Sequence, residues 1–172
     1  MKISTKALVY IAMVAALYAA ITIAQSTFGF GPIQFRIAES LNLLAFFNPI
    51  FIPAVTLGVF LANFIGSPYG IIDAGLGTIA TVIALLLLRV TKKATGNFFL
   101  SSLWVTIANA LIVPVVILLS YEGLEGLTWG AYLPFVVAVA IGQFVVVSIF
   151  GYAMFQSLKQ NQPHFIHTLE NL

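Results

Sequence analysis

The sequence predicts an all-α integral membrane protein, a bundle of six transmembrane helices, and three observations support this fold class. Hydrophobic residues make up 61% of the 172 residues, and the mean hydropathy is +1.09. Charged residues make up 7% of the chain, whereas a soluble domain typically carries about 25%. The charge-free stretches are continuously apolar, unlike the alternating strands of a transmembrane barrel. The surplus apolar surface therefore faces lipid, which excludes an ordinary soluble enzyme, and no basic stripe indicates nucleic acid as a partner.

The gaps between charged residues define the helices. A helix needs about 20 apolar residues to cross about 30 Å of hydrocarbon. The predicted helices are residues 5–27, 34–47, 49–65, 71–90, 97–120 and 131–158, all in a single substrate-binding domain that covers residues 1–172. Residues 159–172 are predicted to be a polar tail in which His164 and His167 are solvated.

In the first helix an apolar run follows Lys2 and Lys6, as in a signal peptide. Its apolar run is longer than in a signal peptide and holds no Ala-x-Ala cleavage pair, so we expect a retained helix. Small residues recur in it with a spacing of four, in two rows: Ala12, Ala16 and Ala20 in one, Ala15 and Ala19 in the other. Such rows let helices approach closely, either within the bundle or against a partner.

The second helix, residues 34–47, is short for a full crossing, so it is tilted, packed inside the bundle or partly re-entrant. Asn48 and Pro49 form the turn to the third helix, and residues 66–70 separate the third helix from the fourth. Pro114 is expected to kink the fifth helix. The sixth helix follows a short loop and ends before the polar tail.

The positive charges predict the orientation of the bundle. With six crossings both termini lie on one side, and the basic residues that fall on that side are Lys2, Lys6, Arg89, Lys92, Lys93 and Lys159. By the positive-inside rule this side is cytoplasmic. The opposite side carries Glu122, Glu125 and one basic residue, Arg36. The position of Arg36 therefore needs its own explanation.

Three charged residues near the outer membrane face are the candidate ligand-binding residues. Arg36 and Glu39 are three apart on a helix and share a face, and Asn42 lies near Glu39. Asp73 opens the fourth helix. Charges at this depth usually face a cavity or a partner, so we expect an outward-opening cleft. In the simpler alternative, Arg36 and Glu39 only neutralise each other and Asp73 caps its helix.

Polar and aromatic residues in other helices extend this candidate set. Asn63, Asn109 and Gln143 are expected to line the same cavity, or alternatively to hold helices together. Aromatic residues near the outer loops are Phe35, Tyr69, Trp129 and Tyr132. They could stack on a planar ligand, although an interfacial aromatic belt is the simpler explanation. Trp129 is included in the candidate set.

No catalytic residues or metal ligands are predicted. The sequence has no Walker motif, no glycine-rich nucleotide loop, no His-Glu-x-x-His and no Gly-x-Ser-x-Gly, so we expect no enzyme and no cofactor. The loops are too short to hold an ATPase domain. ATP-driven transport would therefore need partner subunits that bind the ATP.

Three segments carry a resemblance to a known family: GPIQFRIAESL at residues 31–41, GVFLAN at 58–63 and DAGLGTIAT at 73–81. Together they resemble the QueT family of queuosine-precursor transporters, which are substrate-binding S components of energy-coupling factor (ECF) transporters. The resemblance extends over roughly residues 5–120 and adds Gln34 to the candidate ligand-binding residues.

The resemblance implies the six-helix S-component fold in a prokaryotic plasma membrane, with both termini cytoplasmic. It implies an ECF module as the partner, made of a transmembrane coupling subunit and two cytoplasmic ATPases. In such families an Ala-x-x-x-Ala face of the first helix docks on the coupling subunit, which here means either Ala12 and Ala16 or Ala15 and Ala19. The S component takes its ligand from outside and topples in the membrane to release it inside.

The implied ligand is a 7-deazaguanine such as preQ1 or queuine. We expect Glu39 to bind the donors of the ring edge, Arg36 the carbonyl and Asp73 an amine, or the same roles exchanged. Two alternatives remain: an S component for another small heterocycle, such as a purine-like compound or a vitamin, and a stand-alone secondary transporter or channel. An intramembrane enzyme that uses the two carboxylates is a weaker third alternative, since no nucleophile or metal cluster accompanies them.

Overall fold

A computed structural model describes residues 4–31 and 33–172, so Lys2 and Pro32 lie outside the described residues. The described chain is all-helical, as predicted. In chain order the α-helices are α1 (Thr5–Ala24), α2 (Ser26–Gly29), α3 (Leu44–Phe47), α4 (Phe51–Gly66), α5 (Gly70–Thr95), α6 (Phe98–Glu122), α7 (Trp129–Gln143), α8 (Tyr152–Asn161) and α9 (Pro163–Glu170). Two 3₁₀ helices, η1 (Ile37–Leu43) and η2 (Gly123–Gly126), and the π-helical segment η3 (Phe144–Gly151) join them.

Four helical stretches of the described chain are long and apolar enough to cross a membrane. They are Thr5–Ala24, Gly70–Thr95, Phe98–Gly126 and Trp129–Asn161. Two shorter apolar stretches, Ile37–Phe47 and Phe51–Gly66, match the predicted second and third helices. Large apolar side chains on the outer faces, such as Ile79, Leu86 and Val137, are about half exposed, as expected for helices that face lipid.

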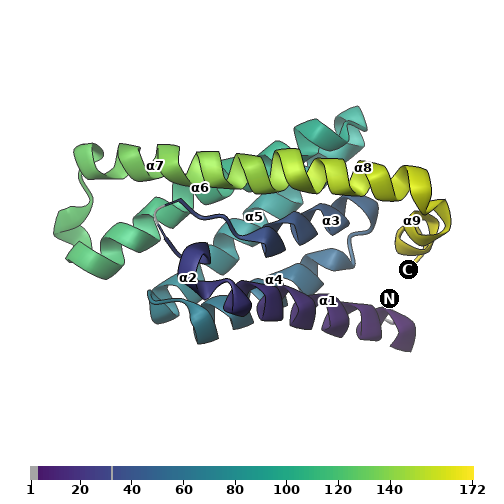
Figure 1. Ribbon diagram of the computed structural model, residues 1–172, viewed down its shortest axis with the longest axis horizontal. Helices are drawn as coiled ribbons and strands as arrows, with labels where there is room; N and C mark the ends of the chain where they lie inside the picture. Colours follow the sequence, from purple (N-terminus) through teal and green to yellow (C-terminus); the bar gives the residue numbers. More distant parts are fainter. Residues whose placement is uncertain (1–3, 32) are drawn as a thin grey trace.

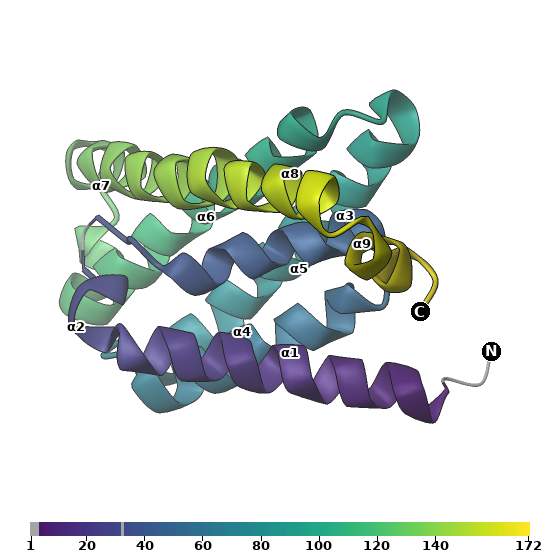
Figure 2. The same cartoon turned by 45° about the vertical axis from the view of Figure 1, so that its right-hand side comes forward.

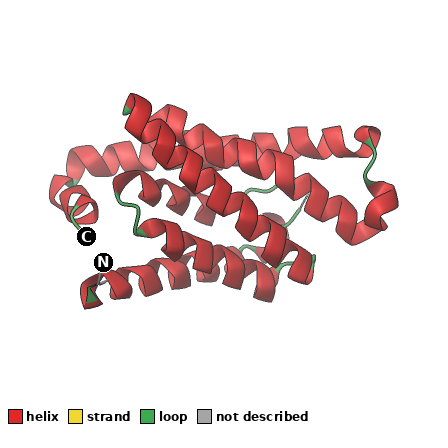
Figure 3. Ribbon diagram, turned by 180° about the vertical axis from the view of Figure 1, so that it is seen from behind, coloured by secondary structure: helices red, strands yellow, loops and turns green. Residues whose placement is uncertain are grey.

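The helices form a bundle around the short segment made of η1 and α3. The rod formed by α7, η3 and α8 runs along one side of the bundle, and α1 runs along the opposite side (Figures 1 and 2). Between them η1 contacts both α1 and η3, and α5 and α6 pack on each other and are in front in the reverse view (Figure 3). The start of α1 and the C-terminal α9 lie at the same end of the bundle (Figure 1).

Small residues set the contact between α1 and α4. A Cβ atom added at Gly58 would lie 2.8 Å from the Cβ of Tyr18 and 2.9 Å from the carbonyl oxygen of Ala15, so only glycine allows this approach. Ala15 and Ala19 are buried in the bundle. The other row of small residues is exposed, namely Ala12, Ala16 and Ala20.

The second predicted helix differs from the sequence expectation. Its first three residues, 34–36, are not helical, Ile37–Leu43 is 3₁₀, and only Leu44–Phe47 is α-helical. Side chains bond to the backbone within this segment: Ser40 Oγ donates to Ile37 O at 2.8 Å, and Asn42 Nδ2 donates to Glu39 O at 3.0 Å. Such local bonds compete with the α-helical ladder and favour the tighter turn.

The C-terminal residues differ as well. Instead of a polar tail, α9 folds back, buries Ile166 and Leu169, and is held by a hydrogen bond of 3.2 Å from Asn48 Nδ2 to Glu170 O. His164 and His167 are exposed, as expected. The buried apolar side chains of this segment are three residues apart, as in an amphipathic helix. The many polar residues around them led to the prediction of a solvated tail.

Candidate ligand-binding site

The 3₁₀ helix η1 arranges the polar side chains of the second segment in a column. A 3₁₀ helix has about three residues per turn, so side chains at i and i+3 are eclipsed. Arg36 immediately precedes η1, and Arg36, Glu39 and Asn42 therefore follow one another on one face. In an α-helix, Asn42 would be turned away from Arg36. Gln25 fixes the start of the column, because its Oε1 accepts from the N–H of Ile37 at 3.1 Å.

Glu39 is buried and its carboxylate is surrounded by donors. Its Oε1 accepts from the hydroxyl of Tyr18 at 2.8 Å. Its Oε2 accepts from Asn42 Nδ2 at 2.6 Å and from Asn109 Nδ2 at 3.3 Å. Arg36 Nη1 lies 3.6 Å from Oε1. The protein itself therefore provides most of the hydrogen bonds that this carboxylate needs.

Arg36 is held on all sides of its guanidinium group. Its Nε donates to the carbonyl of Gly29 at 3.2 Å, Nη1 to Asn63 Oδ1 at 3.1 Å, and Nη2 to Gln34 Oε1 at 3.0 Å. The guanidinium carbon lies 4.6 Å from the ring centroid of Phe30, a cation–π contact. Arg36 thus fixes the side chains around it, in addition to pairing with Glu39.

Asp73 lies in the first turn of α5 but forms no cap for that helix. Its Oδ1 and its backbone carbonyl both accept from Asn63 Nδ2, at 3.3 and 3.2 Å. The simpler alternative, in which Asp73 only caps its helix, is therefore wrong. Room for the pair comes from Gly77, where an added Cβ would lie 2.6 Å from Asn63 Nδ2 and 2.8 Å from Asp73 Oδ1.

Gln143 and Asn109 complete the cluster from α7 and α6. Asn109 Nδ2 donates to Gln143 Oε1 at 3.2 Å and, as above, to Glu39. Gly142 lets α7 come close to the non-helical residues before η1, because a Cβ there would lie 2.7 Å from the carbonyl oxygen of Gln34. Side chains from α1, η1, α4, α5, α6 and α7 thus meet in one hydrogen-bonded network.

Four buried polar atoms of this network have no hydrogen-bond partner among the described residues. Two are donors, Gln34 Nε2 and Gln143 Nε2, and two are acceptors, Asn42 Oδ1 and Asp73 Oδ2. A buried polar group without a partner costs about 1–3 kcal/mol. Each of the four side chains uses its other polar end to bond a network member, so its orientation is fixed. The cluster thus presents two oriented donors and two oriented acceptors.

The cluster is closed in this structure, unlike the open cleft that the sequence predicts. Arg36, Glu39 and Asp73 are 3%, 2% and 1% exposed. Beside them the hydroxyl of Tyr69 donates to the carbonyl of Phe30 at 2.8 Å, and both side chains are buried. Burial and the neighbouring Tyr121 raise the pKa of Tyr69 to about 12, which extends the pH range over which the phenol is protonated and donates.

The structure brings together all the candidate ligand-binding residues except Trp129. The side chains of Gln34, Arg36, Glu39, Asn42, Asn63, Asp73, Asn109 and Gln143 form the network, and all are buried. Trp129 is 77% exposed and packs against Tyr132, with ring centroids 6.0 Å apart. The sequence analysis did not identify Tyr18 or Phe30. The one available signal for Tyr18 was a hydroxyl in an otherwise aliphatic part of α1.

Comparisons with known proteins cover most of the chain. The model of the QueT transporter family matches residues 8–160. A curated protein, the queuosine precursor transporter QueT of Lactococcus lactis subsp. cremoris (strain MG1363), is 42% identical over 88 residues, which are 50% of this chain and 51% of that protein. The match thus spans about half the length of that relative. No solved structure matches the chain significantly.

Proposed function

The chain belongs to the QueT transporter family, and on this premise we propose that it is the S component of an ECF transporter that binds a queuosine precursor. The observation that carries the proposal is the buried network, in which two donors and two acceptors have no hydrogen-bond partner among the described residues. A protein that folded only for stability would gain by pairing or removing these atoms. A polar ligand of small size would give all four a partner.

A 7-deazaguanine has the matching chemistry. Its ring N–H and exocyclic amine are donors for Asp73 Oδ2 and Asn42 Oδ1, and its carbonyl is an acceptor for the amides of Gln34 and Gln143. An aminomethyl substituent would place a cation near Asp73. These roles differ from the ones that the sequence suggests, because Glu39 and Arg36 are already occupied by protein groups.

Arg36 and Glu39 are then positioning residues. Arg36 Nη2 donates to Gln34 Oε1, which leaves the amide NH₂ of Gln34 to donate to a ligand. Glu39 accepts from the amide NH₂ of Asn42, which leaves the amide oxygen of Asn42 to accept from a ligand. Asn63 orients Asp73, and Asn109 orients Gln143. The charged pair thus works through its neighbours, and a dry environment strengthens every bond in the network.

The membrane arrangement follows from the same proposal. The four long helices and the two shorter apolar segments make six crossings in one domain, and the end that holds the start of α1 and α9 is cytoplasmic. Arg89, Lys92 and Lys159 belong to this end and agree with the positive-inside rule. The coupling subunit of the ECF module docks on the exposed row Ala12, Ala16 and Ala20.

A binding titration tests the assignment of Asp73. Purified protein in detergent is titrated calorimetrically with preQ1, queuine and guanine, and Asp73→Asn is compared with the parent. Loss of a buried charged partner costs about 2–5 kcal/mol, so the dissociation constant should rise at least about 30-fold. Glu125→Gln removes an exposed carboxylate outside the network and should leave it unchanged. Parent-like affinity in both Asp73→Asn and Glu39→Gln would contradict the site.

A second experiment separates the S component from a stand-alone transporter. The protein is reconstituted into liposomes with and without the ECF module. We expect uptake only when the module and ATP are present. Uptake by the chain alone, driven by a proton gradient or a membrane potential, would overturn the S-component proposal while leaving the binding site intact.

A further inference from the structure

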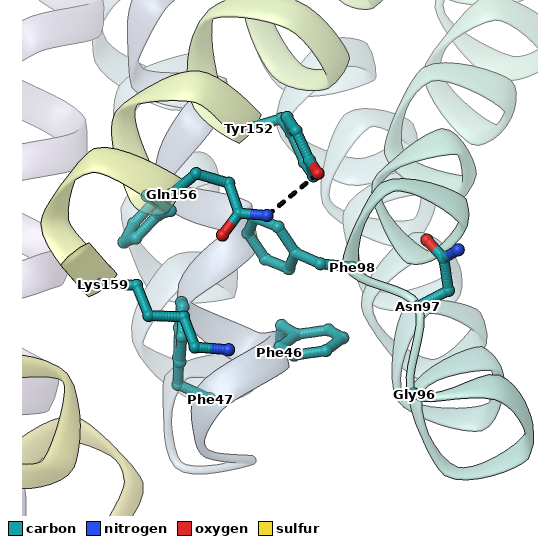
Figure 4. A pocket seen from close by; sticks show the side chains of 9 residues that line it. Phe46, Phe47, Gly96, Asn97, Phe98, Tyr152, Gln156 and Lys159 are labelled. Atoms are coloured by element: carbon teal, nitrogen blue, oxygen red, sulfur yellow. Dashed lines mark hydrogen bonds between the residues drawn. The ribbon is translucent and has the colours of Figure 1, made fainter.

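A cavity lies at the end of the bundle that carries the basic residues, away from the polar network. It has a volume of about 270 Å³ and lies between the end of α3, the turn before α6 and the face of α8 (Figure 4). Its wall is formed by five aromatic side chains, Phe46, Phe47, Phe98, Tyr152 and Phe155. None of the residues proposed above to bind the transport substrate lines it.

The aromatic wall is preorganised. The rings of Phe46 and Phe98 meet edge to face with centroids 4.8 Å apart, and Phe98 stacks on Tyr152 at 5.5 Å. Phe47 packs on Phe155 at 5.4 Å. Such contacts fix the rings and offer an apolar surface to an apolar part of a ligand.

Polar groups stand at the rim of the same cavity. Lys159 extends its ammonium group toward Phe46 (Figure 4), and it forms no ion pair with any described residue. Gln156 Nε2 is held by the hydroxyl of Tyr152 at 2.9 Å. Asn97 caps α6 with its oxygen, which accepts from Leu100 N at 3.0 Å, so its amide NH₂ is left to donate elsewhere. The rim thus offers a cation and amide donors.

The surrounding charge is positive. Arg89 Nη1 and Lys92 Nζ both donate to the carbonyl of Phe46, at 3.0 and 2.6 Å, which fixes two cations at the end of α3. The neighbouring α9 carries one acidic residue, Glu170. An anion at the rim would therefore be attracted by several basic residues at once.

We propose that this cavity binds an anionic phospholipid of the surrounding membrane. The phosphodiester oxygens accept hydrogen bonds from Lys159 and from the amides of Asn97 and Gln156, and the glycerol esters and first acyl carbons lie on the aromatic wall. Basic pockets between transmembrane helices on the cytoplasmic side are suited to such headgroups. A soluble phosphate would use the rim alone, and five aromatic side chains would serve no purpose for it.

The test measures lipid binding to the delipidated protein in detergent. Native mass spectrometry and thermal unfolding are followed during titration with phosphatidylglycerol, phosphatidylcholine, and glycerol phosphate as a lipid-free probe. We expect phosphatidylglycerol to bind and to stabilise, and the other two to bind at least about fivefold more weakly. One basic residue near a lipid surface contributes about 1 kcal/mol, so Lys159→Gln should weaken phosphatidylglycerol binding about fivefold.

Lys93→Gln is the matched control, since it removes the same charge from an exposed residue outside the cavity. It should leave the affinity for phosphatidylglycerol unchanged. Equal losses in Lys159→Gln and Lys93→Gln would show a general charge effect and overturn the proposal. Equal binding of phosphatidylcholine, or glycerol phosphate bound as tightly as the lipid, would also overturn it. Lys159→Gln should bind preQ1 as the parent does. Failure of the lipid-binding proposal is therefore distinguishable from failure of the transport proposal.

Discussion

Glu39 shows how the polar residues of this protein depend on one another. Its carboxylate accepts from Tyr18 of α1, Asn42 of η1 and Asn109 of α6, which lie far apart in the sequence. A buried carboxylate that loses a donor loses much of the interaction that compensates its desolvation. Removal of a single donor from this network should therefore lower the free energy of unfolding measurably.

Removal of the Tyr18 hydroxyl tests this dependence. Tyr18→Phe deletes the 2.8 Å bond to Glu39 and leaves the ring in place. We expect the free energy of unfolding to fall by about 1–3 kcal/mol, because a charged buried acceptor loses its partner. Denaturant unfolding in detergent measures it. Tyr10→Phe is the control, since its hydroxyl makes no hydrogen bond among the described residues. Equal effects of both changes would contradict the role of Tyr18.

The sequence predicts which residues belong to the network better than it predicts how they are arranged. Charged and amide side chains within apolar segments need partners, so Arg36, Asp73 and Asn109 can be identified from position alone. Tyr18 cannot, because tyrosine is common in membrane helices and its partner is distant. Nor can the free donor of Gln143, because it depends on which end of the amide another helix holds. The binding roles of these residues stay predictions.

At the scale of elements, α4 and α5 can approach closely because Gly77 has no side chain. Asn63 of α4 reaches Asp73 across Gly77, and a Cβ at Gly77 would meet both polar groups at less than 3 Å. Gly75 lies two residues earlier in the same helix, and a Cβ added there would meet no other part of the described chain within 4 Å, apart from the adjoining residues and backbone of its own helix. Gly77 is thus required by the contact, and Gly75 is under no such constraint.

These two glycines form a matched pair of variants. Gly77→Ala should displace the Asn63–Asp73 pair, lower the free energy of unfolding by about 1–3 kcal/mol and weaken ligand binding. Gly75→Ala should leave binding unchanged and be neutral or stabilising by about 0.5–1 kcal/mol, since alanine is the better helix former. Thermal unfolding and preQ1 titration of both proteins measure this. Unchanged binding in Gly77→Ala would contradict the geometry of the pair.

The helices themselves were predictable because a continuously apolar segment of membrane length satisfies its backbone hydrogen bonds in lipid by forming a helix. Prediction from the sequence fails where local hydrogen bonds or the spacing of a few apolar residues decide the structure. The start of the predicted 34–47 helix is not helical and continues as 3₁₀, because Ser40 and Asn42 bond to the backbone beside them. The amphipathic α9 was expected to be a solvated tail, because its two buried residues are few among polar neighbours.

At the scale of the whole molecule, the two rows of alanines on α1 have different surroundings. Ala15 and Ala19 pack inside the bundle against α4, whereas Ala12, Ala16 and Ala20 form an exposed strip along the outer face of α1. The sequence left the choice between the rows open. The exposed strip is available to another helix without any rearrangement of the bundle, which makes it the docking face in our proposal.

Tryptophan substitutions distinguish the two rows. Ala16→Trp should leave folding and ligand binding intact but abolish co-purification with the coupling subunit, because the indole prevents close approach of a partner helix. Ala15→Trp should destabilise the bundle itself, since the site is filled by α4. Ile79→Trp, on a half-exposed position of α5, is the control and should retain the complex. A stable complex with Ala16→Trp would rule out the strip as the docking face.

The helix type of η1 has a consequence for how far this segment can change. A 3₁₀ helix advances about 120° per residue and an α-helix about 100°, so rewinding η1 as an α-helix would swing Asn42 roughly 120° around the axis relative to Arg36. Substitutions that strengthen α-helix formation in Ile37–Leu43 could therefore dismantle the network without touching a single polar side chain. The network therefore depends on the winding of this segment as much as on its polar side chains.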